Sequence, residues 1–110
     1  MCCRVCVFMD FLEGLLAMVV GICTMELWFP EPNSLKEKRR ILKSIIDRVR
    51  SRFNVSIAEV DHNDLWQKAS IGIACVANEG SHVNEVLSNV VNFVETSFDV
   101  NLIDYSIQVI

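Results

Sequence analysis

The chain has 110 residues and a mass of 12.5 kDa, which suffices for one domain with a single core but not for two. Hydrophobic residues make up 52% and charged residues 22%, a composition that excludes a disordered chain. The longest uncharged run lies between Glu13 and Glu26 and has twelve residues, too few to span a bilayer, so no membrane partner is expected. The formal net charge of −4, taken as an average, disfavours nucleic acid as a partner.

The first 17 residues resemble a signal peptide superficially, but Asp10 and Glu13 interrupt their apolar run. We expect residues 1–17 to be an extension outside the domain, with a short amphipathic helix as the alternative, and the domain itself to span 18–110.

The five cysteines are unevenly distributed. Cys2, Cys3 and Cys6 crowd the N-terminus, whereas Cys23 and Cys75 lie in apolar runs. The C-x-x-C spacing of Cys3 and Cys6 lacks the second ligand pair of a zinc site, so no metal and no cofactor is predicted. Cys23 and Cys75 are expected to be small buried hydrophobes, and this usage fits a reducing cytoplasm.

From Met18 onward the hydrophobic periodicity alternates between that of strands and that of helices. Ser34 and Glu37 form a capping box, Asn54 is a candidate left-handed helix end, and Ser81 is a candidate N-cap. The predicted elements are a central strand 19–29, a helix 35–53, a strand 55–61, a strand 68–77, a helix that ends near Ser97 and a strand 101–110.

This order, β-α-β-β-α-β, predicts an α+β fold of the ferredoxin-like sandwich type. Right-handed crossovers place both helices on one face of a four-stranded antiparallel sheet. The other face is then left to solvent, a ligand or a partner chain.

Basic residues are concentrated in the first predicted helix. Eight of the ten lie there: Lys36, Lys38, Arg39, Arg40, Lys43, Arg48, Arg50 and Arg52. Against Glu37 and Asp47 they give this helix a charge of +6, which leaves −10 for the rest of the chain.

At about 100° per residue, five of these cations share one stripe beside the apolar face. They are Lys36, Arg39, Arg40, Lys43 and Arg50. Asp47 falls inside the stripe and could pair with Lys43 or Arg50. The stripe is either a solvated helix face or a surface that binds RNA phosphates; an acidic protein surface is a further candidate partner.

The segment between the second and third strands contains Asp61, His62, Asp64 and Trp66. A histidine with two carboxylates could bind a divalent cation or act as a base, but no nucleophile or phosphate-binding glycine loop accompanies it. Turn formation by the acidic residues, with Trp66 anchoring the hairpin on the core, explains the same residues. No catalytic residue is therefore predicted.

Two motifs resemble the YlxP-like family, also known as domain of unknown function 503. They are SLKEKRRILKS at 34–44 and AEVDHNDLWQ at 58–67, and the similarity covers 18–110. The resemblance implies a small bacterial cytosolic protein with a ferredoxin-like fold and no established reaction. It also implies a connection to the ribosome, because members tend to be encoded near translation-initiation and ribosome-maturation factors.

The sequence thus favours a non-catalytic protein that binds ribosomal RNA or a ribosomal subunit through Lys36, Arg39, Arg40, Lys43 and Arg50. The alternative is a homo-oligomeric interaction module without a nucleic-acid partner, joined through the open sheet face or an edge strand.

Overall fold

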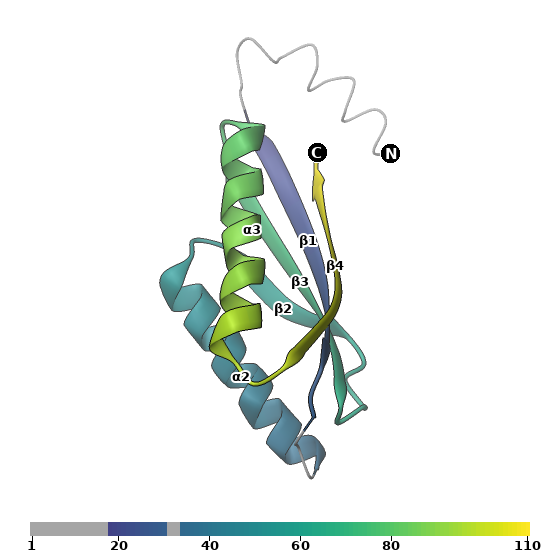
Figure 1. The fold of residues 1–110 in the computed structure, drawn as a ribbon. Coiled ribbons are helices and arrows are strands. Elements are labelled where there is room, and N and C mark those ends of the chain that lie inside the picture. Colours follow the sequence, from purple (N-terminus) through teal and green to yellow (C-terminus); the bar gives the residue numbers. More distant parts are fainter. Residues whose placement is uncertain (1–17, 31–33) are drawn as a thin grey trace.

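The computed structural model describes residues 18–30 and 34–110, and its chain forms one sheet with two helices (Figure 1). The elements are β1 (Val19–Trp28), α2 (Leu35–Arg52), β2 (Ser56–Asp61), β3 (Lys68–Ala77), α3 (Gly80–Ser97) and β4 (Asn101–Val109). The predicted order of elements is confirmed. The predicted extension 1–17, with Cys2, Cys3 and Cys6, lies outside the described residues.

The sheet order is β2-β3-β1-β4 and every neighbouring pair is antiparallel, so β1 is central as predicted. Both helices pack on one face of the sheet, α2 near the β2 edge and α3 over β1 and β3 (Figure 1). The ferredoxin-like α+β arrangement is therefore confirmed.

The core lies between the helices and this face of the sheet. Along β1, alternate residues from Gly21 to Leu27 are buried, because successive side chains of a strand point to opposite faces. Helix α2 contributes Leu42, Ile45 and Val49. Cys23 and Cys75 are buried free thiols, as predicted, and burial raises the pKa of Cys23 to about 11, so its thiol is protonated near neutral pH.

The predicted helix ends are correct at Ser34 and at Ser97, where α3 ends, and wrong at two other positions. Ser34 caps α2, accepting a hydrogen bond from the Glu37 N–H at 3.2 Å. Asn54 does not end this helix in a left-handed conformation, because Phe53 already turns the chain into the extended backbone that leads to β2. Helix α3 begins at Gly80 after the N-cap residue Glu79, two residues earlier than a cap at Ser81 would allow.

No helix within 18–30 and 34–110 is long and apolar enough to cross a membrane.

Candidate nucleic-acid interface

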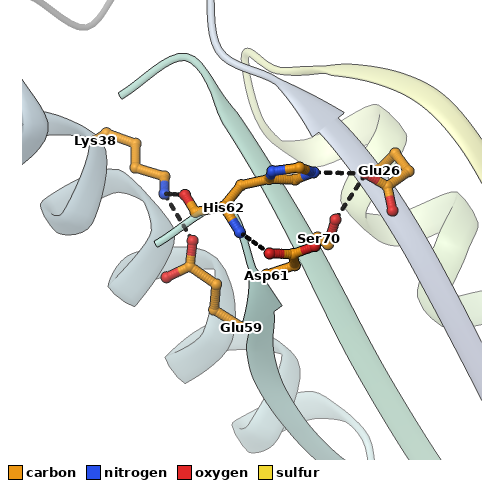
Figure 2. A network of polar contacts seen from close by, with 6 residues as sticks. All are labelled: Glu26, Lys38, Glu59, Asp61, His62 and Ser70. Carbon is orange, nitrogen blue, oxygen red and sulfur yellow. Dashed lines mark hydrogen bonds and ion pairs between the residues drawn. The ribbon is translucent and has the colours of Figure 1, made fainter. Parts of the chain in front are cut away.

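The structure divides the basic residues of α2 into those used inside the fold and those left on its surface. Lys38 belongs to the first group, with a side chain that is 0% exposed. Its Nζ donates to Glu59 Oε2 at 2.6 Å and to the carbonyl oxygen of His62 at 3.1 Å (Figure 2). Because a carboxylate on β2 neutralises it, Lys38 adds nothing to the surface charge that the helix total of +6 implied.

Three arginines in the second half of α2 also contact other elements. Arg50 donates to the carbonyl oxygen of Ile57 on β2 at 3.1 Å and so fastens the helix to an edge strand. Arg48 and Arg52 lie over aromatic rings of the α3 side of the fold, Arg48 over Phe98 and Arg52 over Phe93. All three remain partly accessible to solvent, but their positions are fixed by these contacts.

The four remaining cations gather in the first half of α2. Lys36, Arg39, Arg40 and Lys43 line one shallow, open hollow of about 520 Å³ together with Ser34 and Glu37. Four of the five residues of the predicted phosphate-binding stripe are therefore brought together. Arg50, the fifth, lies apart and lines a different hollow beside Asn54 and Ser56.

The electrostatics of this hollow favour an anion. Its cations stand on the first turns of a helix, where the aligned peptide dipoles add partial positive charge. Lys43 forms an exposed ion pair with Asp47 at 3.0 Å, which is one of the two pairings that the sequence left open. No ion pair joins Lys36, Arg39 or Arg40 to another residue of 18–30 or 34–110. Their charges are thus available to a ligand.

The hairpin segment from Asp61 to Trp66, to which the sequence assigned no function, connects the β2–β3 hairpin to α2. His62 has a positive φ of 64°, which turns its carbonyl oxygen toward Lys38 of α2. The same oxygen accepts a hydrogen bond from the Leu65 N–H at 3.1 Å, and the His62 N–H donates to Asp61 Oδ1 at 2.7 Å. The backbone of one residue therefore joins the first turns of α2 to the tip of the β2–β3 hairpin.

The His62 ring faces the open side of the sheet (Figure 2). Its Nε2 lies 3.8 Å from Glu26 Oε1 on β1, and that oxygen accepts a hydrogen bond from Ser70 on β3 at 2.7 Å. Asp64 is exposed. Among the described residues, no group of three or more His, Cys, Asp or Glu side chains is placed to hold a metal ion.

Trp66 does not anchor the hairpin on the core, contrary to the prediction, because its side chain is 43% exposed. The return strand is instead held by its backbone, since the Phe29 N–H donates to the Gln67 carbonyl at 2.8 Å.

Lys38 and Glu59 were not singled out as site residues from the sequence. The signal was present in the spacing, because Lys38 precedes Leu42, Ile45 and Val49 on the buried face of the helix.

Two comparisons place this arrangement among known proteins. The chain is 38% identical over 78 residues to the uncharacterized protein YlxP of Bacillus subtilis (strain 168), a match that covers 71% of this chain and 85% of that protein. The de novo designed protein Foldit4 has the same fold at a TM-score of 0.52 and 10% identity, with 84% of this chain and 96% of that one covered.

The sequence model of one family matches residues 20–107, nearly the whole part of the chain that forms the sheet and helices. The chain therefore belongs to the DUF503 family, described as proteins of unknown function.

Proposed function

We propose that this protein binds RNA, with ribosomal RNA as the leading candidate, through the basic hollow on the first half of α2, and that it has no catalytic activity. The observation that carries the proposal is the grouping of Lys36, Arg39, Arg40 and Lys43 around one concavity. Four cations at this spacing can neutralise several phosphates of one strand, which gives affinity without base recognition.

The contacts of the basic residues of α2 favour RNA binding at the hollow over the alternative of a solvated helix face without a ligand. Lys38 and Arg50 are bonded to β2 within the fold. The four cations of the hollow are exposed, and within 18–30 and 34–110 only Lys43 among them has an ion pair, an exposed one with Asp47. Two of these four are arginines, whose planar guanidinium groups match the geometry of phosphate oxygens.

The open sheet face is not built for base stacking. The strand registers place Trp28 on this face, and within the described strands no second aromatic side chain shares it, since Tyr105 lies opposite the inward-facing Met25. Phosphate contacts by α2 are thus the favoured mode of RNA binding. RNA contact by such a surface requires neither cofactor nor metal and suits a cytoplasmic protein.

A salt series tests the proposal. Binding of ribosomal RNA and of single-stranded oligouridine is measured by filter retention for the wild type and for Arg39→Gln/Arg40→Gln. For oligouridine, loss of two phosphate contacts should weaken binding about tenfold and lower the slope of log K against log salt by about 1.4, because each single-strand phosphate contributes roughly 0.7.

The matched control is Arg50→Gln/Lys68→Gln, which removes the same number of charges outside the hollow and should bind almost as the wild type does. Equal affinities and slopes for the two double variants would mean that only overall charge matters, and the site would be wrong. Wild-type binding that is absent at low salt would overturn the function itself.

The second candidate is homo-oligomerisation through the open sheet face, favoured by its exposed apolar side chains. Val76 is 62% exposed, Val60 is 60% exposed and Ile22 is 36% exposed. A second copy that covers these residues would leave α2 of both copies accessible, so the two candidate functions are compatible. Sedimentation at increasing protein concentration tests it.

A further inference from the structure

A groove with a volume of about 500 Å³ lies between the C-terminal halves of α2 and α3. Arg48 and Arg52 line it from α2, and Asn89, Asn92, Phe93 and Thr96 line it from α3. No residue that lines this groove is acidic, although the whole chain has 14 acidic and 10 basic residues. The groove is thus lined by two formal positive charges and no formal negative charge.

Aromatic rings hold the two guanidinium groups in place. The guanidinium carbon of Arg48 lies 4.8 Å from the centroid of the Phe98 ring, and that of Arg52 lies 5.1 Å from the centroid of Phe93. The rings themselves pack edge to face, with Phe93 between Phe53 and Phe98. An arginine held over a ring keeps its N–H groups free at the edge of the guanidinium plane.

Those N–H groups are not used inside the fold. Within 18–30 and 34–110, neither Arg48 nor Arg52 has a side-chain hydrogen bond or an ion pair. Two fixed cations one helical turn apart, with ten N–H donors between them by the chemistry of arginine, match the oxygens of one phosphate group. The amide groups of Asn89 and Asn92 can add neutral hydrogen bonds.

A continuous row on α2 connects this groove to the basic hollow. Arg40, Ser44, Arg48 and Arg52 follow one another at intervals of four residues, which places them along one ridge of the helix surface. All four are exposed and none is acidic. Arg40 and Arg48 are separated by about 12 Å along the helix axis, a distance that a flexible strand of RNA can cross.

We infer that the groove between α2 and α3 is a second phosphate-binding site, which receives a phosphodiester of the same RNA strand after it has crossed Ser44. This inference rests on the proposed function and extends its footprint along one ridge of α2, from Arg40 in the first half to Arg52 at the end; Arg50 lies off this ridge, on the β2 side. In this arrangement the RNA strand follows the ridge along α2, and Arg48 and Arg52 in the groove bind the phosphate at its far end.

The test uses fluorescently labelled oligouridine, long enough to span α2, and the variant Arg48→Gln/Arg52→Gln. Its slope of log K against log salt should be lower than that of the wild type by about 1.4, as expected for two lost single-strand contacts. The control Arg50→Gln/Lys68→Gln, with the same change in net charge, should keep the wild-type slope. Arg48→Lys/Arg52→Lys, which keeps both charges, should keep the slope and bind more weakly.

Wild-type protein supplies an independent readout, because removal of the cation–π contacts could loosen the helices. The ring-proton NMR signals of Phe93 and Phe98 should shift as oligouridine is added, since a phosphate at the guanidinium edges changes the field at both rings. Unmoved ring signals at saturation, or equal slopes for the Arg48/Arg52 variant and its control, overturn the second site.

The outcome for the Arg39→Gln/Arg40→Gln variant separates the two proposals. If its binding is weakened while the groove variants behave as their control, RNA binding stands and the second site is wrong. If the wild type binds no RNA, both proposals are overturned.

Discussion

At the scale of single residues, the position of a basic residue on α2 determines whether it stabilises the fold or faces solvent, and the residue type alone does not. Lys36 and Lys38 are both lysines, but Lys38 occupies a buried position, where the Glu59 carboxylate and the His62 carbonyl oxygen accept its hydrogen bonds. The sequence establishes how many charges α2 contains. Which of them reach solvent depends on where β2 and the hairpin place their acceptors.

The Lys38–Glu59 pair makes a direct prediction about stability. Lys38→Met leaves Glu59 without its cation and the His62 carbonyl without one of its two donors, so we expect the free energy of unfolding to fall by about 3 kcal/mol. Replacing both partners, in Lys38→Met/Glu59→Leu, should recover much of this loss because no uncompensated charge remains. Urea unfolding followed by circular dichroism measures both values.

Lys43→Ala is the control, since it breaks the exposed pair with Asp47 and should cost less than about 1 kcal/mol. A cost for Lys38→Met no greater than that of Lys43→Ala would show that the buried pair does not stabilise the fold.

His62 shows why part of the hairpin could not be predicted. A left-handed residue was expected at Asn54, because asparagine tolerates that conformation. The structure places it at His62, and the reason is tertiary: the carbonyl of His62 turns toward Lys38, 24 positions away. A contact of this kind leaves no local signal in the sequence.

At the scale of elements, the order, type and core face of each helix and strand were predictable because apolar periodicity determines them. The errors fall at ends such as Ser81, where local capping preference is outweighed by where the strand before the helix stops. Sequence periodicity also did not indicate how closely α3 approaches the sheet, because that distance depends on one small residue, Gly21.

Gly21 allows α3 to lie directly against β1. A Cβ atom at this position would collide with the Val83 side chain and lie 2.8 Å from Leu87 Cδ1, and both side chains belong to α3. We therefore expect Gly21→Ala to lower the free energy of unfolding by about 1–3 kcal/mol through overpacking, as measured by thermal or urea unfolding.

Gly80→Ala provides the contrast, because its Cβ would meet only Val109 Cγ1 at 3.7 Å, an ordinary contact. That variant should be neutral or slightly more stable, since alanine restricts the unfolded chain and suits the first turn of a helix. If the two variants have equal stability, close packing at Gly21 is not what positions α3.

At the scale of the whole molecule, the fold places its two exposed surfaces of distinct character on opposite sides. The four cations of the basic hollow are exposed on α2, which covers one face of the sheet, and the apolar residues of the open face lie on the other face. The net charge of −4 does not reveal this separation, because it sums the basic helix and the acidic remainder of the chain. Net charge alone was therefore a poor guide to whether the protein binds phosphate. The strong charge of α2 was visible in the sequence, but the grouping around one hollow required the folded helix.

The open face has the features of an isologous contact between two copies. Val20 lies opposite Val76 and Ile22 opposite Ala74, so apolar side chains of β1 and β3 form a continuous patch. A twofold axis through the patch would bury it against itself and present two α2 helices to one RNA, which raises the apparent affinity through multivalency.

We therefore expect wild-type protein to dimerise with rising concentration in sedimentation velocity and Val76→Asp to remain monomeric, because the dimer would bury an unpaired charge. Val109→Asp is the matched control: Val109 is also an exposed valine, but it lies opposite Gly21 and thus on the helix-side face of the edge strand β4.

If Val109→Asp is monomeric and Val76→Asp still dimerises, the contact lies at the β4 edge and not on the open face. If the wild type stays monomeric at high concentration, the proposed dimer does not form. Under the proposed arrangement, Val76→Asp also weakens binding of long RNA while leaving the affinity for short oligouridine unchanged, because the basic face of each copy is intact.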